Sequence, residues 1–392
     1  MPHPSVELSS HELSGDVHPI LHRLRAEAPV VWVPAIDRWL VTERELVLEA
    51  LLDVATYTVD DPRFTTAQVV GPSMLSTDGA AHARHRSPFA LPFRRRASVE
   101  GFESSTRAAA TDLVDELLLA GATGNPVDLR SGLAAPLAVT TITEALGLVD
   151  TSGDELLTWY GEIVAAVEAV TAGASPGAGV EAAFAALDAA VRRSIAEPDS
   201  LIATIAARSN LTTEELVSNT AVMLFGAIET SEGMTANALV HVLGDDGVMA
   251  ELRERPELVE QAVEESLRME PAATLVDRYV TAEARLGNVV LPAGAAVSLS
   301  LAGANRDPEF FADPDRFDLR RSNAGHHLAF VHGPHACIGM HLARLETVAA
   351  IQAVLAVLGG VELVDRDRAQ PRGLVFRKPE AIWAKFGNAT AT

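Results

Sequence analysis

Cysteine is nearly absent from this chain: Cys337 is the only one among 392 residues. A single cysteine excludes a disulfide within the chain and any zinc or iron–sulfur site built from several thiolates. Nothing in the cysteine content points to an oxidising compartment, so we expect a cytoplasmic protein. The one thiol that remains needs a separate explanation.

Long apolar runs and an excess of basic charge are also missing. No segment approaches the roughly 20 apolar residues that cross a bilayer, and the N-terminal stretch MPHPSVELSSHELSGDVHPI lacks the regions of a signal peptide. The 31 Lys and Arg stand against 53 Asp and Glu, a formal charge of −22. Nucleic acids and anionic membranes bind surfaces rich in Lys and Arg. We therefore expect no nucleic acid partner and no membrane anchor.

Helical periodicity is the main pattern in the sequence. Apolar residues recur at spacings of three and four in segments that begin at residues 106, 180, 211 and 337. The segment from 211 opens with a capping box, Leu-Thr-Thr-Glu-Glu, and is long enough to cross a domain. Alternation from Val30 predicts two short antiparallel strands. The sequence predicts a mainly α fold with a small β region: one domain over 1–392, with β structure at roughly 28–60 and a helical remainder.

Two stretches carry no regular pattern. Residues 171–179, TAGASPGAG, are small and flexible, which suits a mobile lid. Residues 305–327 are polar and rich in Asp and Pro, and we expect them to be irregular. Irregular segments of that length are usually functional or disordered.

Cys337 lies in FVHGPHACIG, directly before a helical pattern. A helix N-terminus favours a thiolate over a thiol, and Gly333 and Gly339 permit close approach by a bulky group. Four interpretations fit: a small buried side chain, a catalytic nucleophile, a metal site with His335 and His341, or a thiolate that holds haem iron. No obvious orienting carboxylate accompanies a nucleophile, and a single thiolate argues against structural zinc.

This segment resembles the haem-thiolate signature of the cytochrome P-450 family, F-G-x-G-x-H-x-C-x-G. Val331 stands where glycine is usual in that signature. The resemblance covers essentially the whole chain. It implies a cytochrome P-450 fold in which haem b lies between the long central helix and the Cys337 loop, with the Cys337 thiolate as axial ligand to iron. The matching residues are Phe330, Gly333, His335, Cys337 and Gly339.

A second motif is Glu265-Ser-Leu-Arg268 on a predicted helix, where a spacing of three places acid and base on one face. Alone such a pair carries little information, because most are solvated surface ions. Here it precedes Asp313-Pro-Asp-Arg316-Phe, which looks like the family's meander. The resemblance implies that Glu265, Arg268 and Arg316 form a buried ionic triad with a structural role.

A third motif, Gly226-Ala-Ile-Glu-Thr, lies at the most apolar point of the central helix. Burying an ionised carboxylate there costs free energy unless it has a hydrogen-bond partner or contacts water. The motif is similar to the family's oxygen-binding A-G-x-D/E-T, with Ala227 where glycine is common. The resemblance implies that Glu229 and Thr230 are catalytic and relay protons, with the Thr230 hydroxyl bonding back to the carbonyl of Gly226.

A fourth set would hold the haem propionates. His82 and Arg86 are spaced four apart and resemble the family's H-x-x-x-R, while Arg278 and His335 match its other propionate contacts. Arginine suits bidentate binding of carboxylates.

The resemblance also places a substrate pocket, along Val69–Leu75, 168–179, Val222–Ala227, Ala273–Val276 and Leu374–Phe376. Its side chains are nearly all aliphatic or small, which favours a hydrophobic small molecule held by shape. The residues expected to line it are Val222, Gly226, Ala227, Leu275, Val276 and Val375.

The implied activity is that of a monooxygenase, which inserts one oxygen atom from dioxygen into the substrate by hydroxylation or epoxidation. No G-x-G-x-x-G follows a strand, so electrons must come from a separate protein, in this family a ferredoxin with an NAD(P)H-dependent reductase. Arg94–Arg96 could dock that donor or be a solvated charge run. We expect a monomer. The alternatives are oxidative coupling or desaturation at the same site, and a haem protein that binds ligands without turnover, which would not need Glu229 and Thr230.

Overall fold

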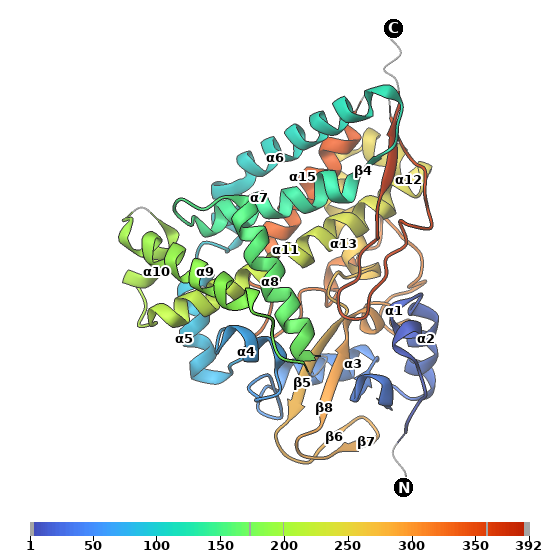
Figure 1. The fold of residues 1–392 in the computed structure, drawn as a ribbon. Helices are drawn as coiled ribbons and strands as arrows, with labels where there is room; N and C mark the ends of the chain where they lie inside the picture. Colours follow the sequence, from blue (N-terminus) through green and yellow to red (C-terminus); the bar gives the residue numbers. More distant parts are fainter. Residues whose placement is uncertain (1–3, 172–173, 199, 358–359, 388–392) are drawn as a thin grey trace. The chain divides into compact units, whose positions relative to one another are not determined.

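The computed structural model describes residues 4–171, 174–198, 200–357 and 360–387 (Figure 1). The chain forms two compact units. Unit 1 comprises Met1–Thr58, Ser104–Leu137 and Thr230–Thr392, and unit 2 comprises Val59–Glu103 and Ala138–Glu229. Three helices continue from one unit into the other, namely α6 (Arg95–Ala120), α7 (Ala135–Leu146) and α11 (Thr213–Leu243). The expectation of a single domain stays a prediction.

Unit 2 is built from helices, and no strand occurs among its described residues. Its helix α8 buries one stripe of side chains, Leu156, Trp159, Ile163 and Ala166, at spacings of three and four. This stripe is why the segment is helical and why it packs against its neighbours α4 and α9. The helices wholly in this unit are α4 (Thr65–Val70), α5 (Gly79–Ala90), α8 (Gly153–Thr171), α9 (Gly179–Ala196) and α10 (Leu201–Ala207).

Unit 1 contains a five-stranded sheet in the order β1-β2-β8-β5-β3. The predicted antiparallel pair is confirmed, because Val30 lies opposite Val41 and Val33 opposite Arg38. The sheet extends beyond the expected range 28–60, since β8 pairs parallel with β2 and antiparallel with β5. Figure 1 shows β5 and β8 side by side. Two short strands alone are marginally stable. Pairing with β8 satisfies the backbone N–H and C=O groups along the outer edge of β2. The strands are β1 (Val30–Val33), β2 (Arg38–Val41), β3 (Tyr57–Thr58), β5 (Leu275–Val280) and β8 (Ala296–Ser300).

The remaining elements of unit 1 are short strands and helices. A second sheet has the order β4-β10-β9, and β6 pairs with β7. The strands are β4 (Val127–Asp128), β6 (Ala284–Leu286), β7 (Val289–Leu291), β9 (Val361–Leu363) and β10 (Trp383–Phe386). The helices are α1 (Ser10–Ser14), α2 (His18–Glu27), α3 (Arg44–Leu52), α12 (Asp246–Glu254), α13 (Val259–Met269), α14 (Leu301–Ala304) and α15 (Met340–Leu355). Single turns are η1 (Pro34–Ile36), η2 (Gly121–Thr123), η3 (Arg130–Ala134), η4 (Pro256–Leu258) and η5 (Ala324–His326).

The predicted central helix is α11, and its predicted capping box forms at Thr212. The Glu215 backbone N–H donates to Thr212 Oγ1 at 3.2 Å, and the Thr212 N–H donates to Glu215 Oε2 at 2.9 Å. Two otherwise unpaired donors are thereby satisfied at the helix start.

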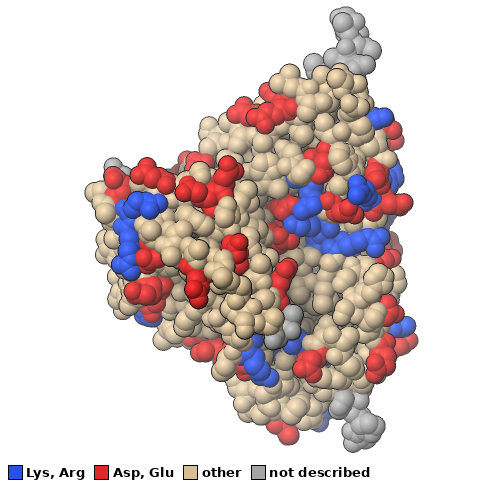
Figure 2. Space-filling view, in the orientation of Figure 1, with Lys and Arg blue, Asp and Glu red and all other residues tan. Residues whose placement is uncertain are grey.

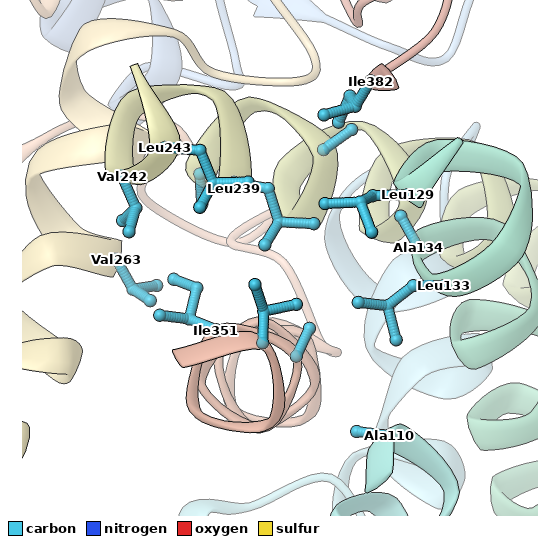
Figure 3. Close-up of a cluster of buried hydrophobic side chains, with 14 of the residues drawn as sticks. Ala110, Leu129, Leu133, Ala134, Leu239, Val242, Leu243, Val263, Ile351 and Ile382 are labelled. Atoms are coloured by element: carbon cyan, nitrogen blue, oxygen red, sulfur yellow. The ribbon is translucent and has the colours of Figure 1, made fainter. Parts of the chain in front are cut away.

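The main core of unit 1 joins α11, α13 and α15. Figure 3 shows Leu239, Val242 and Leu243 of α11 pointing toward Ile351 of α15, with Val263 of α13 beside them. All five side chains are almost fully buried. Burying a Leu, Ile or Val side chain stabilises the fold by roughly 1.5 to 3 kcal/mol, so this cluster fixes α15 against α11 and α13.

The visible surface carries both signs of charge, with carboxylates over much of it and Lys and Arg in smaller groups (Figure 2). This agrees with the excess of acidic residues in the sequence. Among the described residues, the structure contains no helix that is both long and apolar enough to cross a membrane.

Candidate functional site

Cys337 lies immediately before α15, whose N-cap residue is Gly339. Its backbone N–H donates to the carbonyl of Phe330 at 2.9 Å, and the N–H of Ala336 donates to the carbonyl of Gly333 at 3.1 Å. These two bonds close a tight loop. The loop carries the half-buried thiol near the N-terminus of α15. The partial positive charge of a helix N-terminus stabilises a thiolate at such a position.

The loop requires glycine at one of its two left-handed positions and strains a valine at the other. Gly333 has φ +79°, and a Cβ there would lie 2.9 Å from the carbonyl oxygen of Leu51. Val331 has φ 50°, a conformation that is rare for a β-branched residue. Its side chain packs against the core cluster around the five-stranded sheet. The valine that replaces the family's glycine therefore keeps a left-handed backbone at a steric cost.

The residues of unit 1 around this loop fit haem. A Cβ added at Gly339 would meet nothing within 4 Å, so the helix start offers open space beside the thiol. The donor set consists of a soft thiolate for iron and two groups that bind carboxylates: the buried guanidinium of Arg278 on β5 and the half-exposed ring of His335. In the part of the chain that the structure describes, no group of three or more His, Cys, Asp or Glu could hold a metal ion.

A second set of contacts supports the loop from α13 and α15. Glu264 accepts from Arg344 Nε at 2.5 Å, and its other oxygen lies 3.3 Å from His327 Nε2. The Arg344 guanidinium stacks on the Phe330 ring, 4.6 Å from its centroid. Burial by itself would raise the pKa of Glu264, but His327 and Arg344 hold that pKa at about 2. The ring of Phe330 is thus fixed by a cation, and its carbonyl in turn holds Cys337.

The buried ionic triad forms with a different third member from the one expected. Arg268 donates to both oxygens of Glu265, at 2.7 and 2.9 Å, and neither side chain is exposed. The second cation is Arg321, whose Nε donates to Glu265 Oε1 at 2.8 Å. The prediction of Arg316 was wrong: its side chain is exposed, and only its backbone carbonyl takes part, accepting from Arg268 and Arg321.

The triad holds the irregular passage 305–327 in place. Arg268 Nη1 donates to the carbonyls of Pro314 at 2.7 Å and Asn305 at 3.1 Å. Arg321 donates to the carbonyls of Ala312 at 2.6 Å and Asp313 at 3.0 Å. The predicted irregularity is confirmed, apart from the single turn η5. The passage is ordered because buried guanidinium groups satisfy its carbonyls.

The motif Gly226–Thr230, which is expected to relay protons, occupies the middle of α11. Gly226 is exposed there, and a Cβ added to it would meet nothing within 4 Å. Glu229 and Thr230, three and four residues later, are half-buried and flank the same side of the helix. Within unit 2, the Tyr160 hydroxyl of α8 donates to Glu229 Oε2 at 2.7 Å. This supplies the partner that a carboxylate needs at an apolar stretch.

His82 and Arg86 of α5 lie one helical turn apart in unit 2, His82 buried and Arg86 half-buried. The predicted helical spacing is therefore confirmed, and the predicted binding of propionates stays a prediction.

A network on the same helix was not foreseen. Arg84 pairs with Glu215, and this lowers the pKa of Glu215 to about 2. His85 Nδ1 lies 2.8 Å from Asn219 Nδ2, and Asn219 Oδ1 accepts from the N–H of Met74 at 2.9 Å. The network ties the expected substrate loop Val69–Leu75 to α11.

The expected pocket residues fall into two groups. In unit 1, Leu275 and Val276 of β5 lie next to Thr274, whose N–H donates to the carbonyl of Val375 at 2.8 Å. In unit 2, Val222 is buried, while Gly226 and Ala227 are at least partly exposed. The expected lid at 168–179 includes residues 172–173, which lie outside the described residues.

Arg94, Arg95 and Arg96 are exposed at the start of α6. Arg96 pairs with Glu100 one turn later, at 2.7 Å. The Glu100 carboxylate beside it partly offsets the positive charge that Arg96 can offer a docking protein, although an exposed pair of this kind is weak.

Glu346 is a buried acid that the sequence analysis missed. It lies on α15 and is 3% exposed, and its Oε2 accepts from no described residue. Burial raises the pKa of Glu346 to about 8, opposed by a hydrogen bond with Ser231 of α11. A carboxyl inside the apolar pattern ARLETVAAIQ was a signal that could have identified it.

Comparisons with known proteins identify the family. The family model described as Cytochrome P-450 matches residues 188–358. Cytochrome P-450 107B1 of Saccharopolyspora erythraea is 34% identical over 346 residues, which cover 82% of either chain. The chain belongs to the cytochrome P-450 family. A cytochrome P-450 of this kind is a haem-thiolate monooxygenase, and its relatives include enzymes named for oxygen insertion. The mycinamicin IV hydroxylase/epoxidase of Micromonospora griseorubida is 33% identical over 339 residues, 83% of either chain.

A solved structure shows that the cytochrome P-450 fold covers more of the chain than the family-model match over residues 188–358 does. The crystal structure of P-450BioI in complex with hexadec-9Z-enoic acid ligated acyl carrier protein superposes with a TM-score of 0.86 at 26% sequence identity and covers 97% of this chain and 100% of that one. The predicted fold class, mainly α with a small β region, is confirmed.

Proposed function

We propose that this cytochrome P-450 inserts one oxygen atom from dioxygen into a hydrophobic small molecule, by hydroxylation or epoxidation, and that Cys337 would supply the thiolate that holds the iron of haem b. The observation that carries the proposal is the position of Cys337: the chain's only thiol lies at the start of α15, in a glycine-lined loop closed by its own backbone N–H.

Bound haem supplies oxygen activation, which a thiolate ligand favours by pushing electron density toward the iron. The protein supplies the rest. The hydrogen bond from the N–H of Cys337 to the Phe330 carbonyl fixes the thiol, Gly333 allows the turn against Leu51, and Gly339 leaves room beside the thiol. His82, Arg86, Arg278 and His335 would bind the two propionates, because cationic donors form charge-assisted bonds with carboxylates.

Glu229 and Thr230 would deliver the protons that oxygen activation consumes. The two side chains flank the exposed Gly226, and the open space there would let each of them donate a proton to a group bound beside α11. Val222, Ala227, Leu275, Val276 and Val375 would line an apolar substrate site.

Electrons would come from a ferredoxin-type protein served by an NAD(P)H-dependent reductase, because the chain has no nucleotide fingerprint of its own. Arg94 and Arg95, exposed at the start of α6, offer a basic surface to an acidic donor.

The assignment of Cys337 is tested by the absorption spectrum of the reduced protein under carbon monoxide. We expect the long-wavelength Soret band that thiolate-ligated haem gives. A band at the shorter wavelength of haem bound by a neutral ligand, in freshly purified protein, would contradict the proposal.

Thr230→Ala is expected to raise the share of consumed dioxygen that is released as hydrogen peroxide by at least about tenfold, because a positioned proton-transfer group typically contributes about a hundredfold or more to the rate. The measurement is peroxide formed per dioxygen consumed with NADPH, ferredoxin and reductase. Thr220→Ala is the matched control, since it removes a hydroxyl that donates to the Leu216 carbonyl on the same helix. Equal peroxide yields in the two variants would remove Thr230 from the mechanism.

A further inference from the structure

Tyr160 makes a contact that the family motifs do not include. Its phenolic hydroxyl donates to Glu229 Oε2 at 2.7 Å, and both residues belong to unit 2. The chain has only three tyrosines, and the other two, Tyr57 and Tyr279, are almost fully buried. A hydroxyl that donates to a carboxylate makes one of the stronger hydrogen bonds in proteins.

Helix α8 holds the phenol in a fixed position. Trp159, the preceding residue, is buried, and so are Leu156 and Ile163, which lie one turn away on either side. Tyr160 therefore sits at the border of the stripe that packs α8 into unit 2, with its backbone anchored and its side chain half-buried. The anchored backbone of α8 therefore holds the hydroxyl beside Glu229.

Glu229 carries its carboxylate at the end of a long side chain. Its side chain has three rotatable bonds, and ordering such a side chain costs roughly 1.5 to 2 kcal/mol. On α11 it borders the side that also carries Gly226 and Thr230. The bond to Tyr160 keeps the carboxylate at this border.

We propose that Tyr160 is a positioning residue of the proton supply: its hydroxyl orients the Glu229 carboxylate for proton delivery alongside Thr230. This rests on the proposed role of Glu229. It predicts that removal of the hydroxyl alone impairs proton delivery while leaving haem binding intact, because Tyr160→Phe keeps the aromatic ring and removes only the hydrogen bond to Glu229.

The activity test uses dioxygen itself as the probe, so that no substrate need be known. With NADPH, ferredoxin and reductase, Tyr160→Phe holoenzyme is expected to release about tenfold more peroxide per dioxygen consumed than the native protein, the size of one hydrogen bond to a charged group at its weaker end. Thr158→Val is the matched control on α8, since the hydroxyl of Thr158 donates to the carbonyl of Asp154 on the exposed face. It should match the native protein.

A double-mutant cycle separates this inference from the proposed function. Glu229→Gln should raise peroxide release, and Tyr160→Phe should add nothing in that background. If Glu229→Gln has no effect, the proposed role of Glu229 fails. If Glu229→Gln has its effect but Tyr160→Phe has none, or adds its full effect to the double variant, the role of Tyr160 fails while that of Glu229 stands.

A readout independent of turnover is fluorine NMR of protein labelled with 3-fluorotyrosine. Three tyrosines give three resonances, and Tyr160→Phe identifies the one from Tyr160. Glu229→Gln should shift that resonance and leave those of Tyr57 and Tyr279 in place. An unmoved Tyr160 resonance would overturn the contact on which the inference depends.

Discussion

An Arg268→Ala variant is expected to lose on the order of 3 to 5 kcal/mol of folding free energy, the cost of leaving a buried charge without its partner. The charge left behind is Glu265, whose side chain is fully buried. The same change removes the donors that hold the carbonyls of Pro314 and Asn305. Expressed protein should therefore bind little or no haem, measured as the ratio of Soret to protein absorbance.

Arg321→Ala and Arg316→Ala distinguish the observed triad from the expected one. Arg321 is buried and bonds Glu265, so its loss should resemble that of Arg268. Arg316 has an exposed side chain and contributes only a backbone carbonyl, which alanine retains. We expect Arg316→Ala to bind haem fully and to unfold within about 0.5 kcal/mol of the native protein. An Arg316→Ala variant as damaged as Arg268→Ala would contradict the structure, as would fully loaded Arg268→Ala.

Glu346→Gln is expected to stabilise the protein at alkaline pH. Burial raises the pKa of Glu346 from 4.5 to about 8. Below pH 4.5 this carboxyl is neutral in both states and costs nothing. Between pH 4.5 and about 8 the unfolded chain ionises while the folded one stays protonated, so native stability falls with rising pH. The gap between these two pKa values corresponds to on the order of 5 kcal/mol, a penalty that glutamine avoids.

The measurement is the difference in thermal midpoint between Glu346→Gln and native holoenzyme across that pH range. The difference should be smallest near pH 4.5 and should grow toward pH 8. Glu362→Gln on β9 is the matched control, because Glu362 is exposed. A pH-independent difference for Glu346→Gln would show that the folded state carries an ionised carboxylate at this position.

The motifs that the sequence located correctly are those whose residues are close together along the chain. Cys337 was predicted before a helix, and α15 begins at Met340. Glu265 and Arg268 were predicted on one helical face, and they bond at 2.7 Å. In both cases a short spacing and a single element determine the geometry, so the pattern alone suffices.

The residues that the sequence misplaced or missed depend on distant segments. Arg316 and Arg321 lie in the same irregular passage, and no periodicity indicates which of them turns inward. Glu346 is buried because α11 and α13 cover α15 within unit 1. No sequence pattern identifies Tyr160. It bonds Glu229 because α8 passes beside α11 within unit 2.

The sequence by itself determined the family, the thiolate loop, the central helix and the apolar character of the expected substrate site. It also placed Val331 at a glycine position, but only the backbone showed that this valine adopts φ 50°. The tertiary structure alone decided which arginine completes the triad and which hydroxyl meets Glu229. The physical reason is that spacing along one element fixes which side chains share a face, whereas the partner of a buried charge depends on where a remote segment passes.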